Sequence, residues 1–141
     1  MDQSQYLSIL AGVPAEEIKP FVDDLLKHIS RVDVLLNRTG LVMVPVQDTV
    51  EGTHFNIGEV LVAESHVKIQ ANGAEAEGYA MVMGRDLEQS LAVALLDASL
   101  QVGFMSDHIL AFVSAHGTRQ AQADDLLLRQ VEATRVEMET F

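Results

Sequence analysis

The stretch that decides the fold reads GYAMVMGRD and occupies residues 78–86. It is an apolar, strand-like run that turns through Gly84, Arg85 and Asp86 into a strongly apolar segment. Two earlier runs have the same strand-like character, and they read TGLVMV (39–44) and FNIGEVLV (55–62). Loops rich in Gly, Asn and Asp separate the three runs. Their order predicts a sheet that leads directly into a helix.

The middle of the chain predicts antiparallel pairing. Residues 60–70 alternate between core-type and polar side chains, which is typical of a strand with one face in a core and the other increasingly exposed to water. Asn72 and Gly73 then predict a tight turn, and residues 79–83 predict the returning strand. These segments favour a β-meander.

The region before this meander is less regular. Apolar residues within 32–46 surround the turn-forming cluster at 37–40, which predicts a hairpin there. Pro45 favours an edge strand or a strand end. Residues 47–58 contain few core-type side chains, so we expect them to be the longest irregular stretch and to contact another molecule.

Helices are predicted before and after the sheet. The segment 86–102 is apolar over a wide arc, so it is expected to be the central helix packed on the sheet. The fold class is therefore α+β, an antiparallel β-meander of three to four strands covered by helices, in a single domain over residues 1–141. Its expected parts are N-terminal helices within 3–29 (3–10 and 14–29), a sheet within 32–83, and C-terminal helices within 86–134 (86–102, 107–115 and 119–134).

Composition excludes several classes of function. The chain has no Cys, which removes disulfides, thiolate metal sites and thiol nucleophiles. Its formal net charge of −12 argues against nucleic-acid binding, because phosphate contacts need Lys and Arg. No run approaches the roughly 20 apolar residues of a membrane helix, and the first residues do not resemble a secretory signal. We therefore expect a cytoplasmic protein that contacts neither membrane nor nucleic acid.

The sharpest local motif is Gly84-Arg85-Asp86, and two interpretations compete for it. In the structural one, Gly84 forms a tight turn, Asp86 caps the next helix, and Gln89 completes a capping box. In the functional one, the backbone amides of that helix N-terminus, with Arg85 beside them, receive an anion or a partner's carboxylate. Arg85 is the residue for which the functional interpretation is strongest, because the chain has few cations.

A second candidate site covers residues 54–59. Gly58 is expected to permit a bend between loop and strand, whereas Asn56 and Glu59 either tie down the loop backbone or face a partner. His54 and Phe55 are candidates for a partner-binding surface. His54, Phe55, Asn56 and Glu59 are interpreted as ligand- or partner-binding candidates rather than catalytic groups, whereas Gly58 is given a structural role.

Catalytic machinery is not recognisable in the sequence. The five His residues have no metal-ligand spacing such as His-Glu-x-x-His, so no metal site is predicted. No Ser-His-Asp order, nucleotide-binding glycine loop or carboxylate pair can be assembled either, and Gly73 and Gly78 are interpreted as turn glycines. The residues therefore indicate a binding or assembly subunit without a cofactor of its own.

The ordered motifs TGLVMV (39–44), FNIGEV (55–60), Gly84-Arg85-Asp86 and ALLDASLQ (94–101) resemble the PhnG family. PhnG is a small subunit of the bacterial carbon-phosphorus lyase system, which uses phosphonates. A weaker similarity covers ATRVE (133–137), in the C-terminal segment. Each motif is short, but their order and gaps together make the resemblance fairly specific.

The resemblance implies a role inside an assembly with PhnH-, PhnI- and PhnJ-like subunits. This assembly would convert ATP and an alkylphosphonate such as methylphosphonate to ribose 1-phosphonate 5-triphosphate with release of adenine, so the chain would be part of a multi-protein transferase. The PhnI-like subunit is expected to act as the nucleosidase. The iron-sulfur cluster and S-adenosylmethionine are expected only on the PhnJ-like subunit, which cuts the carbon-phosphorus bond later.

A different class of function remains open, namely a stand-alone α+β protein that binds a small molecule without catalysis. Such a protein should carry a concave pocket, whereas a subunit should expose apolar area for a partner to cover. We also expect the isolated chain to form a homodimer, because an exposed partner-binding surface tends to self-associate.

Overall fold

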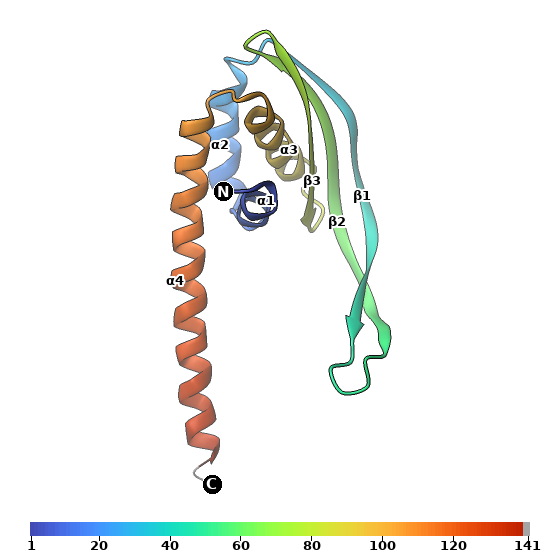
Figure 1. The fold of residues 1–141 in the computed structure, drawn as a ribbon, viewed down its shortest axis with the longest axis vertical. Helices are drawn as coiled ribbons and strands as arrows, with labels where there is room; N and C mark the ends of the chain where they lie inside the picture. The colour runs from blue at the N-terminus through green and yellow to red at the C-terminus, as the bar shows by residue number, and fades with distance from the viewer. Residues whose placement is uncertain (140–141) are drawn as a thin grey trace.

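The computed structural model describes residues 1–139, and for Asn56 and residues 135–139 it describes the backbone alone. The described chain is α+β, as the sequence predicts, with helices before and after a small sheet. Figure 1 shows the arrangement of the elements. In chain order they are α1 (Gln3–Ala11), α2 (Ala15–Leu26), β1 (Arg31–Gln47), β2 (His54–Ala71), β3 (Ala74–Met83), α3 (Leu87–Val102) and α4 (Ser106–Glu139).

The sheet is an antiparallel meander with the order β1-β2-β3. Asn72 and Gly73 make the turn between β2 and β3, as predicted, and both have positive φ, 53° and 74°. These backbone angles match the twist of tight hairpins. The pairing of β2 with β3 runs from Ala71 back to Val62, which lies opposite Met83. Beyond Val62, toward its N-terminal end, β2 pairs with β1 alone.

Helix α3 packs against one face of the sheet and builds the core with it. Gly78 in β3 explains how closely the two approach. A Cβ at Gly78 would lie 2.0 Å from the Ala94 carbonyl oxygen and 2.6 Å from the Ala98 nitrogen. Gly78 is therefore a packing residue in a strand, and the prediction of a turn there is wrong.

A buried polar cluster joins three elements at this core. The Asp97 carboxylate on α3 is 2% exposed and accepts hydrogen bonds from Tyr6 Oη, from Gln3 Nε2 at 3.2 Å and from the Tyr79 backbone N–H at 3.0 Å. Since every buried polar side-chain atom of the described residues has a partner, the cluster fixes α1 and β3 relative to α3 without an unsatisfied group.

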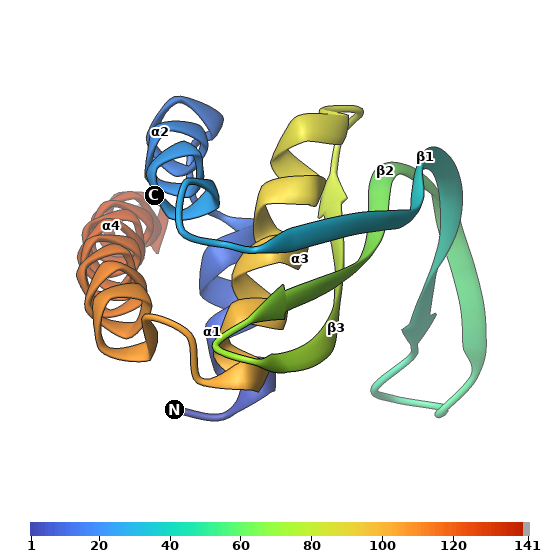
Figure 2. The ribbon, with the colours of Figure 1, turned by 90° about the horizontal axis from the view of Figure 1, so that it is seen from above.

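Helices α1, α2 and α4 complete the body on the other side of α3 (Figure 2). Phe21 of α2 stacks on Phe112 of α4 with ring centroids 4.0 Å apart. The tight contact between α1 and α4 needs Gly117, because a Cβ there would lie 3.0 Å from Ile9 Cδ1. This glycine does not end the helix. The predicted helices 107–115 and 119–134 are one continuous helix, so that division is wrong.

Two predictions about the first strands are also wrong. Residues 37–40 are not a turn but lie inside β1, where Arg38 pairs with Glu64 across the ladder. The irregular stretch predicted at 47–58 is confined to residues 48–53, because β1 continues to Gln47 and β2 begins at His54. The observed sheet thus covers 31–83, and its first hairpin is much longer than expected.

The long hairpin extends past the end of β3 and away from the helices (Figures 1 and 2). We call residues 41–61 the arm. Its strands pair as Leu41 with Leu61 at the base and Gln47 with His54 near the tip, and a register shift at Pro45 marks a bulge. The arm is thus a two-stranded ribbon outside the three-stranded part of the sheet.

Candidate functional site

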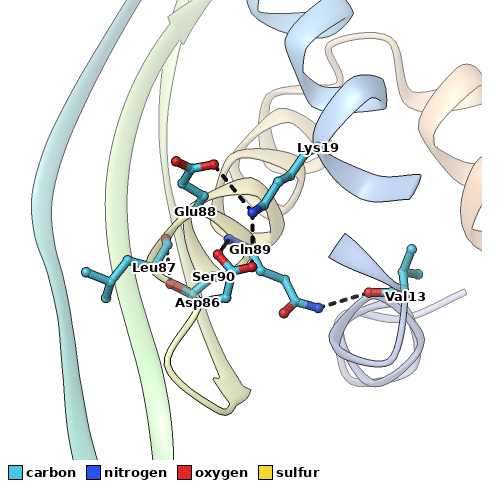
Figure 3. A network of polar contacts seen from close by, with 7 residues as sticks. All are labelled: Val13, Lys19, Asp86, Leu87, Glu88, Gln89 and Ser90. Atoms are coloured by element: carbon cyan, nitrogen blue, oxygen red, sulfur yellow. Dashed lines mark hydrogen bonds and ion pairs between the residues drawn. The ribbon is translucent and has the colours of Figure 1, made fainter. Parts of the chain in front are cut away.

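The N-terminus of α3 follows the Gly84-Arg85-Asp86 motif, and Figure 3 shows the contacts of Asp86 and of the first turn of the helix. Asp86 is the N-cap, as predicted, because its Oδ1 accepts the Gln89 N–H at 3.1 Å. Lys19 of α2 places its Nζ 3.0 Å from Asp86 Oδ2 and 3.4 Å from Glu88 Oε2. The cap is therefore also an ion pair between α2 and α3.

The charges at this cap shift each other's titration. Lys19, followed by the Gln89 N–H, lowers the pKa of Asp86, and Asp86 in turn raises the pKa of Lys19. The predicted capping box is wrong, since the Gln89 side chain donates to the Val13 carbonyl oxygen at 2.9 Å instead (Figure 3). Because Asp86 occupies the helix N-terminus, the interpretation of these amides as an anion site loses support.

Arg85 differs from the other cations of the chain. Among the Lys and Arg residues whose side chains the structure describes, it alone makes no ion pair with a described residue. It is exposed, and it follows Gly84, whose φ of +102° turns the chain away from the sheet. An exposed guanidinium that makes no ion pair within the described residues can bind a carboxylate or phosphate.

Gly84 lies directly beside β2. Its N–H donates to the Leu61 carbonyl oxygen at 2.9 Å, which is the last bond between β3 and β2 at this end. From Leu61 to His54 the edge of β2 has no neighbouring strand in the described chain. We call β2 residues 54–61 the free edge. An exposed strand edge of this kind offers unpaired N–H and C=O groups to another chain.

The free edge contains the second predicted motif. His54, Phe55 and Glu59 are exposed along it, and the Asn56 side chain lies outside the described residues. Gly58 has a φ of +153° and stands where the ladder to β1 shifts register, so its predicted role at a bend is consistent with its geometry. The structure therefore brings both predicted motifs to one edge, with Arg85 at its root.

The arm exposes apolar side chains on both strands. Leu41 and Ile57 are each 64% exposed, and Met43, Val50 and Phe55 are exposed as well. Sequence reasoning identified Phe55 but missed the others. A usable signal was present, because TGLVMV (39–44) is apolar at consecutive positions, whereas a strand with one wet face alternates.

A shallow hollow on the sheet face opposite α3 also carries polar groups. Its volume is about 420 Å³, and it is lined by residues that include Arg38, Glu64 and Met81. Arg38 Nε lies 2.9 Å from Glu64 Oε1, and Tyr79 Oη donates to the same carboxylate. These hydrogen bonds lower the pKa of Glu64, while burial and the bond to Glu64 raise the pKa of Tyr79 to about 12.

A sequence model of the family described as Phosphonate metabolism protein PhnG matches residues 1–141, the whole chain. The chain belongs to the PhnG family. A comparison with curated proteins finds no match. Membership in PhnG places the chain in phosphonate metabolism.

The described part of this PhnG-family chain contains no cluster of three His, Asp or Glu residues that could hold a metal ion. Within residues 1–139, no helix has the length and apolar character needed to cross a membrane. The polar groups of the hollow are engaged with one another, as are those of the α3 cap.

Proposed function

We propose that this chain is an assembly subunit of the carbon-phosphorus lyase system. In this role it helps form α-D-ribose 1-methylphosphonate 5-triphosphate from ATP and methylphosphonate, with release of adenine. Family membership supports the phosphonate pathway. The single observation that supports the assembly role is the arm, an apolar two-stranded ribbon that no described element covers.

The physical argument rests on the instability of such a ribbon. An isolated two-stranded hairpin is marginally stable in water, and a long exposed apolar edge invites pairing with another chain. Contiguous exposed apolar surface of this kind marks an interaction site. The arm of this protein is therefore expected to be ordered and covered in an assembly.

The chemistry in this proposal belongs to the partners. PhnH-, PhnI- and PhnJ-like subunits supply it, and the iron-sulfur cluster and S-adenosylmethionine act on the PhnJ-like subunit. This chain contributes binding surface, with Arg85 as the candidate for contact with a phosphate or a partner's carboxylate. The assembly works in the cytoplasm.

A second candidate function has one observation in its favour. The hollow beside Arg38 and Glu64 combines apolar walls with a charged pair, which is the composition of a small-molecule site. The hollow is open, and Arg38 is already paired with Glu64. The small-molecule function is therefore less well supported than the assembly role. A stand-alone binder would take up ligand in the absence of any partner.

The test is co-expression of this chain with the PhnH-, PhnI- and PhnJ-like proteins of the same genome, followed by an assay of adenine release from ATP and methylphosphonate. Activity that requires this chain supports the proposal. Arg85→Ala is expected to lower activity or assembly, while Arg129→Ala, on the exposed part of α4, serves as the matched control. A chain that neither co-purifies nor affects adenine release would contradict the proposal.

A further inference from the structure

The free edge is suited to pairing with a copy of itself. Two identical strands related by a two-fold axis run antiparallel, so residues 54–61 of one chain can lie beside the same residues of another. The edge carries one charged residue, Glu59. Because Glu59 is not at the centre of the segment, the symmetry places the two carboxylates at different points along the ladder rather than directly opposite.

We propose that the free edges of two copies pair antiparallel and join the arms into a four-stranded sheet, β1-β2-β2-β1. The register has its two-fold axis between Ile57 and Gly58, so that residues 55–60 of the two copies pair and Leu61 keeps its bond with Gly84. Each paired segment is about 20 Å long at roughly 3.3 Å per residue. The proposal concerns the isolated chain and does not depend on the proposed function.

Charge complementarity supports a second copy as the occupant. In this register, the root of one arm lies beside the tip of the other, because the strands run in opposite directions. The root carries Arg85, which has no ion pair among the described residues, and the tip carries the exposed Glu51 and the half-buried Asp48. The unpaired cation of each copy thus meets the acidic tip of its partner, twice per dimer.

Pairing of the two arms would also stabilise them, because an isolated two-stranded ribbon is only marginally stable in water. A four-stranded sheet exceeds the three strands that independent stability requires. The backbone groups of Leu61 point toward β3, since its carbonyl accepts from Gly84. Alternate residues of a strand direct their backbone N–H and C=O groups to the same side. The backbone groups of Glu59 therefore also point away from β1, where a second copy can form hydrogen bonds with them.

The first experiment measures the mass of the purified chain by sedimentation across a range of concentrations. The wild type is expected to be a dimer. Glu59→Pro removes an outward N–H without removing a bond to β1, so dimerisation should be lost while the helical content is retained. Arg85→Glu should weaken the dimer roughly tenfold, and Arg129→Glu, with the same charge change on α4, should not.

The second experiment uses the absence of Cys in the chain. Ile57→Cys lies beside the proposed two-fold axis, so mild oxidation should give a disulfide-linked dimer. Val50→Cys at the tip is 89% exposed, but the two tips would lie more than roughly 20 Å apart, beyond the span of a disulfide. It should not cross-link within the dimer.

Three outcomes would overturn the proposal. One is a monomer at every concentration, which would indicate that the free edge binds a different subunit and not a second copy. Another is a dimer that survives Glu59→Pro and Arg85→Glu unchanged, which would move the contact to the exposed leucines of α4, Leu126, Leu127 and Leu128. The third is cross-linking through Val50→Cys but not through Ile57→Cys.

Discussion

The two halves of β2 have the same backbone pairing with β1 but opposite surroundings. In the half that also pairs with β3, Val67 and Ile69 are fully buried under α3, and the alternate side chains face water. In the arm, Ile57 is 64% exposed and its strand has a single neighbour. Hydrogen bonding within a ladder is therefore not what distinguishes a stable sheet from a binding surface. The difference is that α3 packs over the first half, whereas no described element packs over the arm.

The strongest way to break the covered half is to add one methyl group at Gly78. Gly78→Ala puts a Cβ into the backbone of α3, so the helix must move away from β3. We expect a loss of about 3 kcal/mol or more in the free energy of unfolding, measured by urea denaturation.

The matched change is Gly40→Ala in β1, one residue before the arm begins. A Cβ at Gly40 meets nothing within 4 Å, and its φ is not in the left-handed region. The change should alter stability by no more than about 0.5 kcal/mol. Equal losses at Gly40 and Gly78 would show that β1 beside the arm is as tightly packed as β3 against α3, contrary to the comparison.

Truncating leucines sharpens the same contrast. Leu96 on α3 is fully buried, so Leu96→Ala should cost roughly 2–5 kcal/mol through lost burial and a cavity. Leu41 in the arm is 64% exposed, and Leu41→Ala should cost less than about 0.5 kcal/mol in the isolated monomer. Thermal unfolding of both variants measures this. A large loss from Leu41→Ala would mean that the arm is covered in the isolated protein.

The cap that joins α2 to α3 is expected to contribute less. Asp86→Ala removes the side-chain cap and the Lys19 pair, and should cost about 1 kcal/mol. Asp86→Asn keeps a capping oxygen and removes the charge, so it separates the two contributions. The pKa of Asp86 is lowered in the folded protein, so its contribution is present above the ordinary carboxyl range and is lost as the pH falls through the lowered value. The Asp86→Asn variant should lose less stability than wild type upon acidification.

The smallest effect concerns Tyr79, which lies opposite His66 in the half of the sheet that pairs with β3. Its pKa is raised to about 12, by burial first and then by Glu64, so its stabilising contribution is present below the ordinary tyrosine pKa of about 10 and lost as the pH rises through about 12. The chain has two Tyr and no Trp, and burial also raises the pKa of Tyr6. Ultraviolet titration of the phenolates should therefore begin above the ordinary range. Glu64→Gln should lower the midpoint of one of them.

Local patterns predicted the covered half of the sheet well. The alternation in residues 60–70, the Asn72-Gly73 turn and the helix after Asp86 are all confirmed, because each depends on a few neighbouring residues. The residues of the arm were harder. The turn-forming cluster at 37–40 stays extended because Arg38 and Glu64 pair across the ladder, and such a tertiary contact overrides local preference.

The candidate site was predictable only in part. The cap role of Asp86 followed from its position before an apolar run, and the choice of Arg85 followed from the scarcity of cations. Lys19 was missed, because nothing in the local sequence links α2 to the start of α3. The continuity of α4 through Gly117 was missed for a similar reason, since the packing of Ile9 against that glycine is a distant contact. The positions of His54, Phe55 and Glu59 beside Arg85 required the register of β2.

The two turns of the meander have a consequence for the order of folding. Asn72 and Gly73 close the β2-β3 hairpin over the shortest possible loop, and such hairpins form in roughly microseconds. The β1-β2 hairpin is closed by the longer loop at residues 48–53, and its distal end gains no cover from α3. We therefore expect the strand pairing to start at the tight turn and to reach the tip last. In hydrogen exchange, the amides near residues 48–53 should open first and those of β2 under α3 last.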